Sequence, residues 1–276
     1  MSTFRIALAQ LSSSPDRERN VEGCLNAMRQ AADGGACLIT FPEVVLDRFF
    51  PQNPGDETAR DLAEPVPGPI ADRIAATAAE LGLVTVFNLY ERGEDGQTFD
   101  SSPVWDADGT LLGITRMVHI TQYQHFYEQD YYDLGDRGAP VYDTAVGKVG
   151  VAICYDRHYP EYMRALGVGG AELVVIPQAG SVGEWPQGMY EAEVRTAAFQ
   201  NGYFAALCNR VGVEEHLTFS GESFVADPEG RIIARAQAGV DEVLMADVDL
   251  ELARQSTARR LFWRDRRPEL YGDWLG

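Results

Sequence analysis

Lysine is almost absent from this sequence of 276 residues, in which Lys148 is the only one. The other basic residues are arginines, and acidic residues outnumber them so far that the formal net charge is −19 at pH 7. Nucleic acids and anionic membrane surfaces repel a protein of this charge. The composition therefore argues against either of them as a partner.

Long hydrophobic runs are missing as well. No stretch of the sequence approaches the ~20 apolar residues that a helix needs to cross a bilayer. The N-terminal residues, "MSTFRIALAQLSSS", have neither the basic start nor the long apolar core of a secretory signal. These absences predict a cytoplasmic protein.

Cysteine pairs and Cys/His clusters are also absent. Cys24, Cys37, Cys154 and Cys208 are widely spaced and form no CxxC motif. This spacing does not fit the common zinc motifs, and in a cytoplasmic chain it predicts reduced, mostly buried thiols. We expect neither a metal nor a cofactor. Of the four thiols, only Cys154 needs a further explanation.

Strand-like and helix-like segments alternate along most of the chain, without a Pro/Ser/Gly-rich linker. The expected strands are 4–11, 36–43, 83–91, 147–156, 171–179, 202–212 and 242–250, and the expected helices are 16–35, 69–82, 160–170 and about 185–201. Hairpins are expected over 102–118, turning at Asp108-Gly109, and over 223–236, with an aromatic, polar loop over 119–139. The pattern predicts a single domain, 1–276, of the α/β class, with sheets packed face to face and covered by helices.

Cys154 stands at the predicted carboxyl end of an apolar strand, shortly before a helix that begins at Pro160. Functional groups collect at such positions in α/β proteins, because the strand holds the side chain while the following amides point outward. Those amides stabilise a thiolate and an oxyanion. Cys154 is therefore a candidate nucleophile.

Two acidic residues are candidates for the same site. Glu43 ends the strand in "TFPEVV", and Glu128 lies among aromatic residues in "HFYEQDYYDLGD", which would desolvate it. Each has an alternative interpretation: Glu43 as an acid that turns into solvent, and Glu128 as a loop carboxylate held by a tyrosine or an amide. Position alone does not decide between these interpretations.

Several ordered motifs resemble the nitrilase, or carbon-nitrogen hydrolase, superfamily. They are "FPE" at Glu43, "CYDRHYPE" at Cys154, "GAELVVIPQA", "NRVG" at 209–212 and "GESFVADPEGRII" at 221–233, and the similarity extends from residue 4 to "RDRRPELY" in the tail. The resemblance implies a four-layer α-β-β-α sandwich. It also implies a homodimer or larger homo-oligomer, with the tail, 252–276, in contacts between subunits.

The resemblance further implies covalent catalysis on an amide carbonyl. Cys154 would attack as the nucleophile, and Glu43 would take the thiol proton as general base. The backbone amide of Tyr155 would donate to the oxyanion, and Glu128 would position a lysine or the substrate. The substrate would be a small amide or an N-carbamoyl (ureido) amino acid.

The lysine of this family does not carry over. Related sequences have Arg-Lys-X-His-Ile where this chain has "RMVHI", so Met117 occupies the lysine position and offers no donor. Lys148 is ~20 Å from Cys154 along an extended strand, and strand alternation points Arg116 to the opposite face. Protonated Glu128, His119 and Arg157 remain as substitutes.

Two further questions stay open at this stage. Arg157 resembles an arginine that holds a substrate carboxylate in carbamoyl amino acid hydrolases, but it could equally pair with Asp156 or with an acid on the next helix. The activity could also be that of a nitrilase acting on a nitrile, or the chain could be a degenerate member with a binding or regulatory role. The leading hypothesis is an amidase or carbamoylase.

Overall fold

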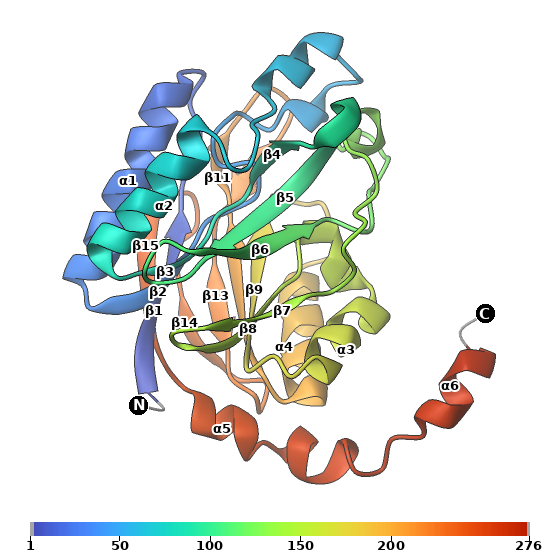
Figure 1. Cartoon of the computed structure of the whole chain (residues 1–276). Helices are drawn as coiled ribbons and strands as arrows, with labels where there is room; N and C mark the ends of the chain where they lie inside the picture. The colour runs from blue at the N-terminus through green and yellow to red at the C-terminus, as the bar shows by residue number, and fades with distance from the viewer. Residues whose placement is uncertain (1–2, 275–276) are drawn as a thin grey trace.

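The computed structural model describes residues 3–274 and places them in two large β-sheets flanked by helices (Figure 1). The strands are β1 (Thr3–Gln10), β2 (Ala36–Thr40), β3 (Val84–Val86), β4 (Leu89–Arg92), β5 (Thr98–Trp105), β6 (Leu111–Arg116), β7 (Val141–Thr144), β8 (Gly147–Val151), β9 (Leu173–Gln178), β10 (Phe204–Asn209), β11 (Val211–Val213), β12 (Thr218–Ser220), β13 (Phe224–Ala226), β14 (Ile232–Arg235) and β15 (Glu242–Asp249).

The helices are α1 (Arg17–Asp33), α2 (Pro69–Leu81), α3 (Pro160–Val168), α4 (Met189–Asn201), α5 (Leu250–Arg254) and α6 (Pro268–Trp274). Short turns of 3-10 helix are η1 (Phe50–Gln52), η2 (Glu57–Leu62), η3 (Glu94–Gly96), η4 (Glu128–Asp130) and η5 (Cys154–His158), and η6 (Ala258–Phe262) is a π-helical turn. None of the helices within residues 3–274 combines the length and apolar character that crossing a membrane requires.

The two large sheets are mixed, with parallel strands at their centres. The first has the strand order β15-β1-β2-β3-β5-β4, with β6 paired to β5, and the second has the order β14-β13-β10-β9-β8-β7. β1, β2 and β3 run parallel, as do β8, β9 and β10. The carboxyl ends of parallel strands share one edge of a sheet, and the candidate residues follow β2 and β8 at such edges.

Strand alternation explains how the first sheet separates two hydrophobic layers. Ile6 and Leu8 of β1 pack in the core between the two sheets, whereas Ala7 and Ala9 pack in a second core beneath α1 and α2. Successive side chains of a strand point to opposite faces, so an apolar strand supplies both cores. α1 and α2 therefore cover the outer face of this sheet (Figure 1).

The second sheet is built in the same way. Leu173 and Val175 of β9 face the core between the sheets, whereas Val174 and Ile176 face a third core shared with α3 and α4. The layers follow one another as helix, sheet, sheet and helix. The structure thus confirms the predicted four-layer α-β-β-α sandwich.

The expected strand over 83–91 is divided into β3 and β4 at Asn88. The Asn88 side chain is fully buried, so its polar atoms need partners inside the protein. Its Oδ1 accepts a hydrogen bond from Val44 N at 2.6 Å, and its Nδ2 donates to Asp100 Oδ1 at 2.6 Å. The break in the strand therefore connects the segment after β2 to β5.

The turn at Asp108-Gly109 joins β5 to β6, as predicted. Gly109 has a φ of +83°, and its N–H donates to Asp106 O at 2.9 Å. The Asp108 side chain accepts from Thr110 N at 2.9 Å. Because φ is positive, the turn favours glycine at this position.

The C-terminal segment leaves the sandwich after β15. It runs along the base of the molecule through α5 and then extends away to α6 (Figure 1). Leu261 and Phe262 in this segment are 46% and 38% exposed. Both side chains thus expose apolar surface, while the ring of Phe262 also packs edge-on against Phe199 of α4.

Candidate active site

Cys154 lies in a sharp turn between β8 and α3, not on the strand itself. β8 ends at Val151, so the expected strand over 147–156 is too long, although Ala152 N still donates to Val175 O at 3.1 Å. The φ of Cys154 is +40°, a conformation that residues with a Cβ rarely adopt. Strained residues of this kind cluster at functional sites. The strained turn, and not the strand, sets the direction of the thiol.

The thiol contacts a polar side chain that the sequence did not predict. Gln178, the last residue of β9, donates from Nε2 to Cys154 Sγ at 3.3 Å. Arg157 Nη1 donates to Gln178 Oε1 and to Cys154 O, both at 2.9 Å. The available signal was a polar residue at the end of the apolar strand "LVVIPQ". Arg157 thus holds both the carbonyl of Cys154 and the side-chain amide of Gln178, which contacts the sulfur of Cys154.

Glu43 and Glu128 are both completely buried. Glu43 lies beyond the end of β2 and not on the expected strand over 36–43, and its carbonyl accepts from Arg210 Nη1 at 2.8 Å. Glu128 opens η4, and its carbonyl accepts from Tyr132 N at 2.9 Å. Within residues 3–274, the carboxyl oxygens of both side chains lack hydrogen-bond partners. Buried acids without partners destabilise a fold, so they indicate a functional role.

Burial disfavours the charged forms of the candidate catalytic groups. It raises the pKa of Glu43 to about 8, and the nearby Glu128 carboxyl adds to this rise. It also raises the pKa of the Cys154 thiol well above its usual range, with further contributions from Glu43 and Glu128 that Arg157 opposes. The thiol and the acid are therefore electrostatically coupled. A base whose pKa lies near neutrality is well matched to moving a proton.

Asp100 is a third buried carboxyl group at this site, and the sequence did not predict it. It lies on β5, is 1% exposed, and accepts from Asn88 Nδ2, while its Oδ2 has no partner within residues 3–274. Burial raises its pKa well above the usual range, and the charge of Glu43 raises it further. β5 is buried along its whole length and so shows no polar alternation. The expected hairpin also began only at residue 102.

Met117 is held rigidly just beyond β6. Its N–H donates to Asp100 O, and its carbonyl accepts from Gly135 N, both at 2.9 Å. A Cβ at Gly135 would lie 2.5 Å from Met117 O, so this close approach requires glycine. The Met117 side chain is 1% exposed and belongs to the same hydrophobic core as Cys154. A thioether thus occupies this buried position, and its backbone is bound to that of Asp100.

Arg116 does not supply the missing charge. Its Nη2 lies 2.7 Å from Glu91 Oε1, its Nη1 lies 3.0 Å from Asp136 Oδ1, and its guanidinium packs over the Phe99 ring at 3.8 Å. These contacts engage the guanidinium of Arg116 with two carboxylates and an aromatic ring.

His119 is bound to Asp156. Its Nδ1 lies 2.7 Å from Asp156 Oδ1, its N–H donates to the same oxygen at 3.0 Å, and its ring stacks on Tyr159 at 3.5 Å. His119 lies two residues beyond Met117, where a continuous strand would put both side chains on one face, but β6 ends at Arg116. The alternation rule does not apply beyond that end.

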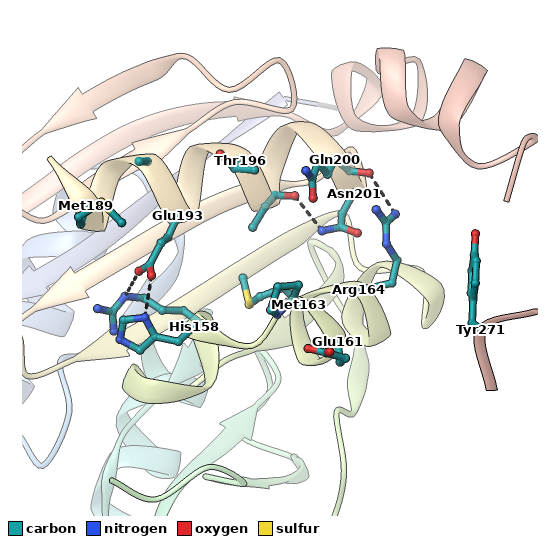
Figure 2. Close-up of a pocket in the computed structure, with 14 residues that line it drawn as sticks. His158, Glu161, Met163, Arg164, Met189, Glu193, Thr196, Gln200, Asn201 and Tyr271 are labelled. Carbon is teal, nitrogen blue, oxygen red and sulfur yellow. Dashed lines mark hydrogen bonds and ion pairs between the residues drawn. The ribbon is translucent and has the colours of Figure 1, made fainter. Parts of the chain in front are cut away.

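Arg157 connects the thiol turn to the groove between α3 and α4. Its Nε lies 3.4 Å from Glu193 Oε2, and its guanidinium lies over the Tyr190 ring at 4.6 Å. Glu193 also pairs with His158 at 2.7 Å, so one carboxylate of α4 serves both residues of the Arg-His pair (Figure 2). Arg157 Nη2 is buried without a hydrogen-bond partner within residues 3–274. The acid that pairs with Arg157 is therefore on α4.

Tyr155 directly follows Cys154 in η5. Its half-buried ring packs edge-on against His158 at 4.9 Å and against Tyr159 at 5.7 Å between ring centroids. These contacts fix the backbone of the turn just after the thiol. The amide of Tyr155 follows the thiol directly in this turn, and its role as an oxyanion donor stays a prediction.

A further carboxylate, Glu184, acts on the thiol from the segment before α4. Its oxygens accept from Tyr123 Oη at 2.5 Å and from Tyr190 Oη. Its charge is one of the causes that raise the pKa of Cys154, after burial, Glu43 and Glu128. The sequence did not predict this residue, because the expected helix from about 185 began just after it. The surroundings of the thiol are therefore strongly acidic.

The structure brings three of the predicted residues together, Glu43, Glu128 and Cys154, and Met117 belongs to the same hydrophobic core as Cys154. His119 binds Asp156. Arg157 contacts the site through its hydrogen bonds to Gln178 and to the carbonyl of Cys154. Within the described residues, 3–274, no three His, Cys, Asp or Glu side chains are arranged to hold a metal ion. The chemistry available to the assembled residues is proton transfer between a buried acid and a thiol.

Comparisons with known proteins bear on the family and the fold of this chain. A family model described as carbon-nitrogen hydrolase matches residues 5–258. N-carbamoylputrescine amidase of Arabidopsis thaliana is 32% identical and aligns over 96% of this chain and 93% of its own length. Citrullinase of Francisella tularensis is 32% identical over 99% of this chain and 98% of its own. A carbon-nitrogen hydrolase of Helicobacter pylori has a crystal structure with a TM-score of 0.93, 30% identity and 99% coverage of both chains.

Proposed function

Because the chain belongs to the carbon-nitrogen hydrolase family, we propose that it hydrolyses an amide or ureido bond through a thioester on Cys154. Relatives that act on ureido compounds support this substrate class, since N-carbamoylputrescine and citrulline both carry a ureido group. The observation that carries the proposal is the coupling of a strained, buried thiol to Glu43, whose pKa is raised to about 8.

The proposed reaction has two covalent steps. Glu43 takes the thiol proton while Sγ of Cys154 forms a bond to the carbonyl carbon, and the carbonyl oxygen becomes an oxyanion. The carbon-nitrogen bond then breaks, and the leaving nitrogen receives the proton from Glu43. Water next attacks the thioester with Glu43 again as base, and the thiol is regenerated. A ureido substrate thus releases one nitrogen as ammonia or amine in the first step, and the carbamate formed in the second step decomposes to carbon dioxide and the other nitrogen as amine or ammonia.

The Tyr155 amide is the proposed backbone donor to the oxyanion. Of the three proposed substitutes for the missing lysine, protonated Glu128 has the strongest support, because burial raises its pKa well above the usual range. His119 is bound to Asp156, and Arg157 is bound to Gln178 and Glu193. Glu128→Gln retains a donor and Glu128→Leu removes it, so only the latter should lower turnover strongly. His119→Asn and Arg157→Lys should have smaller effects.

A substrate panel tests the reaction class. The protein is incubated with amides, N-carbamoyl amines, N-carbamoyl amino acids and nitriles, and released ammonia, amine and acid are quantified. We expect turnover of amide or ureido compounds, an acyl adduct on Cys154 in intact-mass spectra, and loss of both in Cys154→Ser. Acid formed from nitriles alone would indicate a nitrilase. Binding without turnover or adduct for every class would indicate a binding or regulatory protein.

The panel also tests whether Arg157 binds a substrate carboxylate. Its free Nη2 supports such a contact, whereas its pairing with Glu193 weakens it. Arg157→Lys keeps the charge but loses bidentate geometry. A selective rise in KM for carbamoyl amino acids over carbamoyl amines would support the carboxylate contact, and an equal rise for both would contradict it.

We propose that the chain forms a homodimer or larger homo-oligomer through α3, α4 and the C-terminal segment. A groove of about 630 Å³ lies between α3 and α4, and Tyr271 of α6 lines it (Figure 2). The exposed Leu261 and Phe262 support an apolar contact surface. Sedimentation of the full chain and of a chain ending at residue 257 should show a smaller species for the truncated form. An unchanged monomer in both would contradict the proposal.

We also propose a cytoplasmic location. The four cysteines support it, because none forms a disulfide and cysteines of exported proteins are commonly paired. Fractionation of the native host tests it, since recovery of the protein outside the cytoplasmic fraction would overturn the proposal.

A further inference from the structure

Three buried carboxyl groups, those of Glu43, Asp100 and Glu128, form what we call the carboxyl cluster. Each is at most 1% exposed. Apart from Asp100 Oδ1, every carboxyl oxygen of the cluster lacks a hydrogen-bond partner within residues 3–274. Three buried anions without a cation would repel each other strongly. The cluster therefore has to hold protons in order to fold.

Asp100 is the member of the cluster that is fixed in place. Asn88 donates to its Oδ1 at 2.6 Å, and the same amide accepts from Val44 N, the residue after Glu43, at 2.6 Å. The carbonyl of Asp100 accepts from Met117 N at 2.9 Å. Asp100 is thus tied to the backbone on both sides of the site: next to the proposed base and at the position that lacks a lysine.

We propose that Asp100 is a positioning residue that holds a proton and directs it at the Glu43 carboxylate, and so supports the base electrostatically, a role separate from that of the donor proposed for Glu128. The inference rests on the proposed function of Glu43 as general base. A protonated carboxyl group is a donor that costs far less to bury than a second anion. When two carboxyl groups share one proton, the group that does not carry it stays ionised and can act as a base.

The electrostatics of the pair agree with this direction of donation. Interaction with Glu43 raises the pKa of Asp100 beyond the effect of burial, whereas interaction with Asp100 lowers the pKa of Glu43. The two carboxyl groups thus influence each other electrostatically. Asp100 Oδ2 and both carboxyl oxygens of Glu43 have no hydrogen-bond partner within residues 3–274. Of the two, Asp100 therefore keeps its proton more firmly.

The charged and titratable groups around this pair come from several elements. They are Glu128 of η4, Tyr132 just beyond it, Cys154 and Asp156 of η5, and Arg210 after β10. Arg210 is the only cation of this set, and its guanidinium binds the carbonyls of Glu43 and Val44. The remaining groups are acids or neutral donors. The negative charge of Glu43 is therefore balanced by a proton on Asp100.

The pH dependence of Cys154 alkylation tests the inference in the full chain. Iodoacetamide reacts with the thiolate, so the rate should rise with pH as Glu43 becomes able to accept the thiol proton. Asp100→Asn retains a donor and should leave this rise within a few tenths of a pH unit of wild type. Asp100→Leu removes the donor and should move the rise upward by about one unit, which is about tenfold slower alkylation near neutral pH.

An ionised Asp100 would give the opposite result. Removing a nearby negative charge would favour the Glu43 carboxylate, so both variants would then move the rise to lower pH. That outcome, or identical profiles for all three proteins, would overturn the proposal. Because Asp100→Asn is nearly isosteric, it decides the sign even if Asp100→Leu fails to fold.

Controls separate this test from the test of the reaction. Alkylation needs no substrate, so its profile is informative even if every amide and ureido compound fails to react. Peptide mass spectrometry distinguishes Cys154 from the half-buried Cys37, whose profile should be the same in all variants. Glu43→Gln should remove the rise seen at Cys154. If the rise persists in Glu43→Gln, the assignment of Glu43 as the base is wrong. The role of Asp100, which rests on that assignment, is then wrong as well.

Discussion

At the scale of single residues, Met117 places an uncharged thioether in the core that also contains Cys154. Glu43, which interacts with the Cys154 thiol, has a pKa that burial and Glu128 raise to about 8. Met117→Lys introduces a cation there, which should lower the pKa of Glu43 by roughly one to three units. We expect the acid limb of the kcat/KM profile to move to lower pH.

Met117→Leu is the matched control for this change. Leucine fills a similar volume without a charge, so it should leave the pH profile in place. Profiles measured for both variants under the same conditions isolate the effect of the ammonium. If lysine and leucine gave the same profile, position 117 would not be electrostatically coupled to Glu43.

Glu43 should also make the stability of the fold depend on pH. Its pKa rises from an ordinary 4.5 to about 8 in the folded chain, so between these values the folded state holds a proton that the unfolded state has released. Stability should fall through this range as pH rises, by up to about 1.4 kcal/mol per pH unit. Glu43→Gln cannot ionise, so it should gain stability relative to wild type between about pH 5 and pH 8.

Urea unfolding at both pH values measures this gain. The exposed Glu80→Gln serves as control, because a solvated carboxylate of α2 should contribute no comparable change. A difference between wild type and Glu43→Gln that does not change with pH would show that Glu43 is already ionised in the folded protein.

The sequence predicted some residues of the site and not others for physical reasons. Glu43 and Cys154 follow parallel strands and are candidates by position, because chemistry collects at that edge of a sheet, but only the family motifs favour a functional role for Glu43. Asp100 lies on a strand buried on both faces, where no alternation distinguishes a functional acid from a structural one. Gln178 acts through an amide whose target is adjacent only in the folded chain.

At the scale of the elements, the turn between β8 and α3 carries a backbone strain that should be measurable. Cys154 has a φ of +40°, which glycine adopts at no steric cost. Cys154→Gly should therefore be more stable than Cys154→Ala by about 1 kcal/mol, although both are inactive. Chemical denaturation of the two variants measures this difference.

Cys208 provides the reverse comparison for this prediction. It is buried in the extended strand β10, where glycine loses more conformational entropy than alanine. Cys208→Gly should thus be less stable than Cys208→Ala. The same order at both positions would mean that cavity size, and not φ, determines the result.

The layers of the fold follow from periodicity, whereas the ends of its elements do not. Alternating apolar faces in β1 and β9 are sufficient to predict sheets with a core on each side. The ends depend on tertiary contacts: Asn88 divides an apolar run because its amide binds Val44 and Asp100. Boundaries set by such distant partners leave no periodic signal.

At the scale of the whole molecule, the net charge of −19 should influence substrate preference. A strongly negative surface lowers the local concentration of anions and raises that of cations, and salt screens both effects. We expect kcat/KM for a carbamoyl amino acid, relative to a carbamoyl amine of similar length, to rise with ionic strength. If the ratio of the two kcat/KM values did not depend on salt, the net charge of the surface would not influence substrate preference, and only charges in the pocket would.

The hydrogen bonds around Met117 also define a site for a spectroscopic probe. Its amide and carbonyl are both bound, and Gly135 leaves no room for the backbone to shift. A residue with a vibrational label, such as a cyano group, can therefore be introduced at 117 while the backbone keeps its place. The frequency of that label would report the electric field inside the site directly, in the resting enzyme and during turnover.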